Sequence, residues 1–254
     1  MTKKNFINIL IILLVIVITI TSGTLIYAKE NKVEFNDKNL ELAIREVIDK
    51  SDGNINLSEV DKIVELNLFG KGINSIEGIQ YLRNLEKLDL YQNYIADIDP
   101  LSDLENLKEL SLGAWEPNQL TDITPLEDLN KLEYLNLSGN RIEDISPLGN
   151  LNNLRELNLW RNFNINDITP LASLNKLIKL NLSGNQINNL KPLSDLTTLE
   201  ELTFGNNQVE DISPLKKLIN LKVLNFGGSP LPEDGNKVDD ISVISNFRNL
   251  EKLN

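Results

Sequence analysis

The sequence predicts an α/β solenoid, in which short parallel strands line a concave face and short helical turns line the convex face. Eight consecutive stretches of the 254-residue chain repeat a pattern of about 22 residues, L-x-x-L-x-L-x-x-N-x-I-x-D-I-x-P-L-x-x-L-x-x, which is clearest in 85–106 and 132–153. The L-x-L segment alternates with the two-residue period of a strand, so its leucines point inward. A proline follows at the same place in most repeats, where a helical turn can begin.

The leucine spacing and the repeat length are those of a leucine-rich-repeat solenoid, which we expect to wind right-handed. We divide the chain into an N-terminal segment 1–28, a cap over 29–62 and repeats over 63–254. The repeats begin at Ile63, Leu85, Leu107, Leu132, Leu154, Leu177, Leu199 and Leu221, and a truncated ninth begins at Leu250. Because this last strand is incomplete, we expect the chain to continue past Asn254 or another molecule to cover the edge.

An asparagine follows most strands at the point where the chain turns. Its side chain both donates and accepts hydrogen bonds, so we expect it to satisfy buried backbone groups there. The next polar column is aspartate in most repeats but asparagine in one, which indicates hydrogen bonding rather than a Ca²⁺ site. The first column comprises Asn93, Asn118, Asn140, Asn162, Asn185 and Asn207, and the second Asp97, Asp122, Asp144, Asp167, Asn189 and Asp211.

A third column immediately precedes the repeat prolines and predicts where the convex helical turns begin. Its members are Asp99, Thr124, Ser146, Thr169 and Ser213. These residue types cap the N-termini of helices, and proline is favoured at the next position. Lys191 occupies the same place in one repeat, so we expect a looser turn there.

The N-terminal 28 residues have the organisation of an export segment. Lys3 and Lys4 precede an apolar run over 7–20, and the small residue Ala28 precedes a polar stretch. This order predicts a cleaved secretory signal peptide. Residues 6–27 are also long enough to remain as a membrane anchor, with the N-terminal end in the cytoplasm. Both alternatives export the rest of the chain.

Residues 33–55 differ from the repeats and predict an amphipathic helix. Its apolar face comprises Leu40, Ala43, Ile44, Val47 and Ile48. Asn36 and Asp37 are candidate N-caps, Gly53 is the expected stop, and Ser58 is expected to start a second short turn. Because the open end of a solenoid exposes its core, we interpret this helix as a lid over the first repeat.

Composition excludes several classes of function. The chain has no cysteine or histidine, which removes thiol and imidazole catalysis and Cys/His metal sites, and no motif indicates a cofactor or a metal. The net charge is −12, and the 226 residues after the export segment carry 23 basic and 37 acidic side chains, which argues against a nucleic-acid partner. An enzyme would depend on carboxylates alone, as glycan hydrolases do. For that remote alternative the candidates are Glu65, Asp89, Glu109 and Glu156.

Two interruptions of the register place aromatic residues on one edge of the expected concave face. The third repeat has 25 residues with an insertion at 113–118, and the fifth has 23 with one at 160–164. Both tryptophans lie in or beside these insertions, two repeats and thus about 10 Å apart. Because Trp, Tyr and Arg dominate binding hot spots, we predict a partner-binding patch of Phe69, Tyr91, Trp115, Tyr134, Trp160, Arg161 and Phe163. The alternative is that both tryptophans fold back as plugs beneath their own loops.

The cap and the repeats together resemble the bacterial internalins. The D-I-x-P-L half of the repeat and the cap pattern F-x-D-x-N-L-E-x-A-I-R carry this resemblance over about residues 33–254. The cap pattern is formed by Phe35, Asp37, Asn39, Leu40, Glu41, Ala43, Ile44 and Arg45. The resemblance implies an exported adhesin or ligand-binding protein, extracellular or on the bacterial cell surface, that grips a partner protein with its concave face. A glycan ligand and a membrane-tethered scaffold or sensor are the alternatives.

Overall fold

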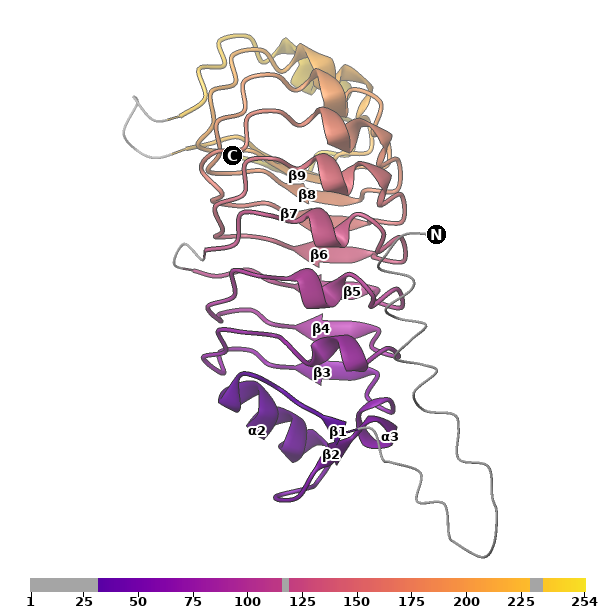
Figure 1. Cartoon of the computed structure of the whole chain (residues 1–254). Coiled ribbons are helices and arrows are strands. Elements are labelled where there is room, and N and C mark those ends of the chain that lie inside the picture. Colours follow the sequence, from indigo (N-terminus) through magenta and orange to yellow (C-terminus); the bar gives the residue numbers. More distant parts are fainter. Residues whose placement is uncertain (1–31, 116–118, 229–234) are drawn as a thin grey trace, which may run out of the picture.

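The computed structural model describes residues 32–115, 119–228 and 235–254, and the export segment predicted at 1–28 and Asn118 lie outside them. The described residues form a curved solenoid with the termini of its sheet at opposite ends (Figure 1). None of their helices has the length and apolar character needed to cross a membrane.

One strand from each repeat enters a nine-stranded parallel sheet in sequence order (Figure 1). Every pairing joins equivalent repeat positions, as in Leu66 beside Leu88 and Leu135 beside Leu157, so the sequence register is also the structural register. The strands are β3 (Glu65–Asn67), β4 (Lys87–Asp89), β5 (Glu109–Ser111), β6 (Tyr134–Asn136), β7 (Glu156–Asn158), β8 (Lys179–Asn181), β9 (Glu201–Thr203), β10 (Val223–Asn225) and β11 (Lys252–Leu253).

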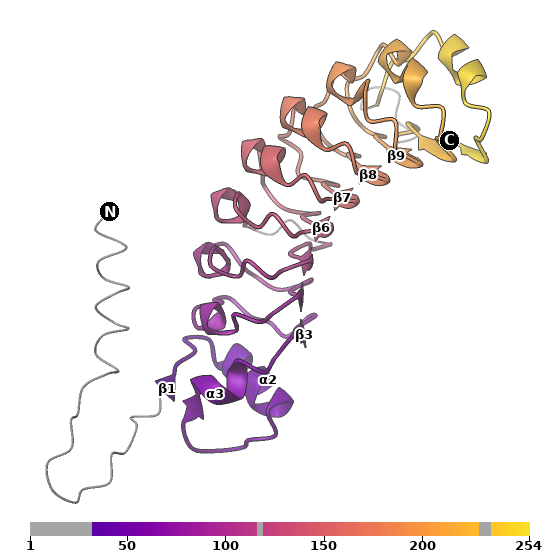
Figure 2. The ribbon, with the colours of Figure 1, turned by 90° about the vertical axis from the view of Figure 1, so that its right-hand side faces the viewer.

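Short 3-10 helices cover the opposite side, as the prolines predict. Figure 2 shows the strands on the inner side of the curve and the helical turns on the outer side, because a helical turn is wider than the spacing between strands of about 4.8 Å. The turns are η1 (Ile79–Tyr81), η2 (Asp99–Leu101), η3 (Thr124–Leu126), η4 (Ser146–Asn150), η5 (Thr169–Ser173), η6 (Lys191–Leu193), η7 (Ser213–Lys217) and η8 (Ser242–Asn246).

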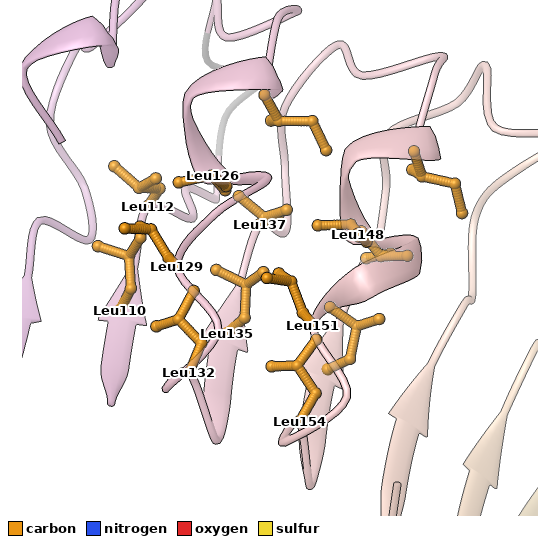
Figure 3. Close-up of a cluster of buried hydrophobic side chains, with 14 of the residues drawn as sticks. Leu110, Leu112, Leu126, Leu129, Leu132, Leu135, Leu137, Leu148, Leu151 and Leu154 are labelled. Atoms are coloured by element: carbon orange, nitrogen blue, oxygen red, sulfur yellow. The ribbon is translucent and has the colours of Figure 1, made fainter. Parts of the chain in front are cut away.

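Leucines from the strands and the turns fill the space between these two sides. Figure 3 shows Leu135 of β6 and Leu137, just after it, on one side of the core, facing Leu126, Leu129 and Leu148 from the convex side. All five are fully buried, and equivalent leucines repeat this arrangement along the stack. The core is therefore one continuous column, and each repeat needs its neighbours to exclude water from it.

The predicted asparagine column forms a buried hydrogen-bond ladder. Asn162 is typical: its Nδ2 donates to the carbonyl oxygens of Leu137 and Leu159 at 3.1 and 3.0 Å, and its Oδ1 accepts from the Ile142 N–H at 3.2 Å. Each asparagine thus ties its own repeat to the one before it. Asn236 also belongs to the ladder, through the Val209 N–H and the Phe226 carbonyl, although the break at 227–237 hides it from the repeat pattern.

The ladder is incomplete beside both insertions. The Oδ1 atoms of Asn140 and Asn185 are buried without a hydrogen-bond partner among the described residues. Each of these asparagines directly follows one of the two lengthened repeats, where the extra residues alter the path of the chain that supplies the donor elsewhere. A buried acceptor without a partner costs stability, so each insertion weakens the ladder at one point.

The aspartate column, rather than the column before the prolines, caps the convex turns. The Asp97 Oδ1 accepts from the Asp99 N–H at 2.9 Å, and the same bond recurs from Asp122, Asp144, Asp167, Asn189 and Asp211. The prediction that Asp99, Thr124, Ser146, Thr169 and Ser213 act as N-caps is wrong, because each is the first residue of its turn and an isoleucine, such as Ile98, precedes it at the N-cap position.

The turn at Lys191 is as well formed as the others. The Lys191 N–H donates to the Asn189 Oδ1 at 2.9 Å, and the Leu193 N–H closes the turn on the Leu190 carbonyl at 3.0 Å. The expectation of a looser turn is therefore wrong, since the cap lies two residues earlier. The uncharged side chain of Asn189 caps this turn, which agrees with the prediction that hydrogen bonding rather than charge matters in this column.

Helix α2 (Lys38–Val47) covers the first repeat, beside a hairpin of β1 (Lys32–Val33) and β2 (Ile55–Asn56) and the turn α3 (Leu57–Val60). Leu40, Ala43 and Ile44 are buried as predicted, but Val47 is 51% exposed. The helix ends at Val47, several residues before the expected stop Gly53, and α3 begins before Ser58. The Asn56 N–H donates to the Glu59 side chain at 2.8 Å, which explains this earlier start.

The polar residues of the cap pattern bind α2 to its surroundings. Asp37 caps α2 through the Asn39 N–H and also accepts the Asn74 N–H of the first repeat, both at 2.8 Å. Burial opposes this charge, but the backbone N–H groups lower the pKa of Asp37. Arg45 pairs with Glu41 at 2.8 Å and donates to the Gly53 carbonyl, which holds the segment after the helix.

Because the asparagine hydrogen-bond ladder is incomplete, replacing asparagine by alanine should have unequal effects at two positions of the ladder. Asn162→Ala removes one acceptor and two donor bonds, whereas Asn185→Ala removes only two donor bonds, because the Asn185 Oδ1 has no partner. We expect Asn162→Ala to lower the free energy of unfolding by about 1 kcal/mol more than Asn185→Ala does. Urea unfolding of both variants measures the difference, and equal losses would contradict this account of the ladder.

Candidate binding surface

The concave face carries two alternating triplets of charge on either side of Tyr134. Lys87 lies between Glu65 and Glu109, with Nζ–Oε1 distances of 3.7 and 3.0 Å. In the other triplet Lys179 lies between Glu156 and Glu201, at 3.1 and 3.9 Å. The hydrogen bond and negative charge of Glu109 raise the pKa of Lys87, and those of Glu156 raise the pKa of Lys179. Both lysines therefore stay protonated, and glutamates on the same face balance their charge.

Tyr134 stands in the same column as these charged residues. It lines a shallow hollow with Glu156, Lys179 and Glu201. Burial, followed by the charge of Glu156, raises the pKa of its hydroxyl. Tyr134 thus lies one column away from the other aromatic residues of the predicted patch.

Aromatic side chains form a continuous ladder along the adjacent edge. Phe69 stacks on Tyr91 with ring centroids 5.7 Å apart, and Tyr91 meets the Trp115 ring edge-to-face at 6.4 Å. Trp115 meets Trp160 edge-to-face at 5.9 Å. These separations favour attraction between aromatic rings. The structure brings Phe69, Tyr91, Trp115 and Trp160 into one row, which we call the aromatic ladder.

Small residues in the fourth repeat allow the two tryptophans to meet. Ser138 occupies the ladder position there, and Gly139 follows it at φ +64°. A Cβ at Gly139 would overlap the backbone of Ala114, which lies directly before Trp115. The insertion therefore packs against this glycine, and the Trp115 ring extends past the small repeat. The rings lie closer than the two-repeat strand spacing predicts.

The ladder continues into Arg161 and Phe163. The Arg161 guanidinium lies 5.1 Å from the Trp160 ring centroid and 5.3 Å from that of Phe163, within the range of cation–π attraction on both sides. Both Arg161 and Phe163 have positive φ, at +54° and +64°. The position of Arg161 has positive φ in other repeats too, where it is occupied by Gly70, Gly139 and Gly184 and by Gln92 and Asn206. The arginine thus adopts a backbone conformation that favours glycine.

The residues of the ladder differ in their exposure to solvent. The Trp115 side chain is 60% exposed, and Phe69 and Phe163 are 53% and 43% exposed. Trp115 is therefore not a plug beneath its loop, whereas Trp160 is partly covered by its neighbours. At the C-terminal end the ladder position is Gly205, where a Cβ would overlap the Gly227 carbonyl oxygen. Close backbone packing thus leaves no room for a side chain there.

The polar column between the strand leucines has a structural role that sequence reasoning missed. The Oδ1 atoms of Asn67, Asp89 and Asn158 accept the N–H groups of Phe69, Tyr91 and Trp160 at 2.9 to 3.1 Å. These bonds fix the backbone from which the ladder side chains rise. Repetition of Asn or Asp two residues before each ladder position is the signal that could have revealed it.

Comparisons with known proteins agree with this architecture. The family described as Leucine Rich repeats matches residues 83–128, 105–150, 130–173, 175–217 and 197–234. An internalin C2 from Listeria monocytogenes is 36% identical with a TM-score of 0.79, over 87% of this chain and 93% of that one. The chain belongs to the internalin family.

Two further internalin structures are similar to this one. InlF from Listeria monocytogenes is 33% identical with a TM-score of 0.72, over 90% of this chain and 72% of that one. InlJ from the same organism, whose functional domain includes a cysteine ladder, is 24% identical with a TM-score of 0.67, over 89% and 52% of the two chains. A comparison with curated proteins finds no match. The internalin fold indicates a protein-binding module.

Three of the four candidate carboxylates on this internalin's concave face are ion-pair partners, and the fourth, Asp89, accepts the Tyr91 N–H. Glu65, Glu109 and Glu156 each contact a lysine, as described above. A general acid for glycan hydrolysis needs a raised pKa, whereas every carboxyl group with a resolved shift in the described residues has a lowered pKa: Glu34, Asp37, Glu41, Glu59, Asp122, Asp167, Asp195 and Asp240.

Sister repeats of this internalin supply a substitution that tests whether Trp160 is structural. The fourth and sixth repeats read Ser-Gly-Asn where the fifth reads Trp-Arg-Asn, so Trp160→Ser with Arg161→Gly restores the common sequence. Loss of the Trp115 contact costs about 1 kcal/mol, and glycine relieves about 1 kcal/mol at a positive φ. We expect the free energy of unfolding, measured in urea, to change by less than about 1 kcal/mol. A loss above about 3 kcal/mol, as for a core residue, would show that Trp160 is a plug.

Proposed function

We propose that this internalin is an exported, non-catalytic module that binds a partner protein on its concave face. The aromatic ladder from Phe69 to Trp160 carries the proposal, because it is a continuous row of exposed and half-buried rings along the sheet. Trp, Tyr and Arg contribute most of the energy at protein interfaces. Arg161, Phe163 and Tyr134 extend the proposed surface at one end and into the adjacent column.

The aromatic ladder reduces solubility and adjoins features that reduce stability, which supports a role in binding rather than in folding. Large exposed aromatic patches reduce solubility unless a partner covers them. The two insertions also leave buried acceptors on Asn140 and Asn185, and the second places Phe163 at positive φ. Local strain and unpaired polar groups are concentrated at functional sites. In this chain the unpaired buried acceptors and the strained backbone both lie next to the aromatic ladder.

The internalin resemblance and the apolar N-terminal segment support export to the cell surface or the medium. The segment 6–27 decides between a secreted module and a membrane-tethered scaffold or sensor. We expect a cleaved signal peptide, and mass spectrometry of the exported protein should then give a mature N-terminus near Lys29. A mature chain that retains residues 6–27 would identify the tethered form instead, and a protein found only inside the cell would contradict export.

Binding can be tested without a known partner, because the two tryptophans of the chain both lie in the ladder. Peptides selected from a displayed random library should change the tryptophan fluorescence on titration. We expect Trp115→Ala to weaken their binding at least tenfold, as does loss of a hot-spot aromatic side chain.

A matched control is Tyr94→Ala, which removes a ring that is 67% exposed and makes no ring contact with the ladder among the described residues. This variant should bind the selected peptides as the unmodified protein does. Equal losses from Trp115→Ala and Tyr94→Ala, or none from Trp115→Ala, would contradict the ladder as the binding site.

A further inference from the structure

Arg161 is a positive charge that the described residues leave without an acidic partner. Its guanidinium contacts the rings of Trp160 and Phe163, and no ion pair or side-chain hydrogen bond joins it to another described residue. The lysines of the neighbouring column differ, since Lys87 and Lys179 each lie between two glutamates. Arg161 thus differs from these two lysines in having aromatic rings rather than carboxylates as its neighbours.

We infer that Arg161 selects partner proteins that present an Asp or Glu carboxylate beside a large apolar side chain. This inference rests on the proposed binding role of the aromatic ladder and adds the chemistry of what is recognised. The carboxylate binds the guanidinium, and the apolar side chain packs on the exposed ring of Trp115.

The two rings orient the guanidinium for this contact. A ring that packs on the face of a guanidinium leaves its N–H groups free at the edge, because these donors lie in the guanidinium plane. The planar fork matches the two oxygens of a carboxylate. Because Trp160 and Phe163 restrict the side chain before binding, less conformational entropy is lost when the carboxylate arrives.

The surroundings favour a side-chain carboxylate over a phosphate or another dianion. The residues after the export segment carry 23 basic and 37 acidic side chains, so their long-range field repels multiply charged anions. The nearest neighbours of Arg161 are aromatic rings rather than further cations that could share a second negative charge. A single carboxylate next to an apolar group complements both features.

The backbone at this position does not require an arginine. Arg161 adopts φ +54°, and the equivalent residues of other repeats, Gly139, Gly184, Gln92 and Asn206, also have positive φ. Glycine fits this conformation without strain. The geometry of the turn therefore does not account for the arginine.

A double-mutant cycle tests the inference with peptides selected on the unmodified protein. We expect the selected peptides to share an Asp or Glu adjacent to an aromatic or large aliphatic residue. Arg161→Gln keeps the length and the strained backbone but removes the charge, and should weaken binding about tenfold. Replacing the peptide carboxylate by its amide should cost the same factor, and both changes together should cost no more than either alone.

Arg141→Gln is the matched control, since Arg141 is an exposed arginine of the preceding repeat and should leave both peptide affinities unchanged. Additive losses in the cycle, or peptides without a shared acidic residue, would overturn the inference. If those peptides still depended on Trp115, the proposed binding role of the ladder would stand by itself. A selection that yields no peptide dependent on Trp115 would contradict both.

Discussion

The fold depends on hydrogen bonds from buried asparagines at the point where each strand ends. A solenoid turns its chain into the core once per repeat, and the backbone groups at that turn cannot reach water. Asn162 satisfies the carbonyls of Leu137 and Leu159 and the N–H of Ile142, which belong to two successive repeats. The same side chain therefore closes one turn and fixes the spacing to the preceding one.

This constraint also explains the geometry of the proposed binding surface. Tyr91 and Trp160 lie two residues after their strands and two before the buried asparagine of the turn, so the residues on both sides hold their backbone in place. The Tyr91 N–H, for example, is bound by Asp89 before the Asn93 turn begins. Where an insertion enters at this place, as before Asn140 and Asn185, the ladder of asparagines loses one acceptor bond and the surface gains large side chains.

Most of the fold could be predicted from the sequence, because each repeat position has one dominant physical requirement. Strand register, convex turns and the asparagine ladder follow from periodicity and hydrogen-bonding capacity. The capping residue was assigned wrongly because two neighbouring polar columns have side chains that can cap a helical turn. Asp99 has such a side chain, but it is the Asp97 side chain, two residues earlier, that accepts the Asp99 N–H. Asn236 was missed because the long break after Gly227 shifts its spacing.

The proposed site was only partly predictable for a different reason. The residue types of the patch and their common edge could be recognised, since tryptophans beside register breaks are conspicuous. Spacing alone could not give the contact between Trp115 and Trp160, because it depends on how far an inserted side chain reaches across Ser138. The position of Arg161 between two rings depends on the backbone torsion of Phe163, which lies in an insertion for which the repeat provides no template.

The glycine and serine of the sister repeats have a consequence for how such a protein diversifies. Ser138-Gly139 and Trp160-Arg161 begin at the same place above the same leucines and the same asparagine turn. Where the neighbouring backbone leaves room, as it does at Trp160, the surface side chains of one repeat can change while the scaffold beneath keeps its shape. Gly139 lacks this room, because a Cβ there would overlap the backbone of Ala114. The repeats can therefore vary at this surface one at a time, each within the space that its neighbours leave.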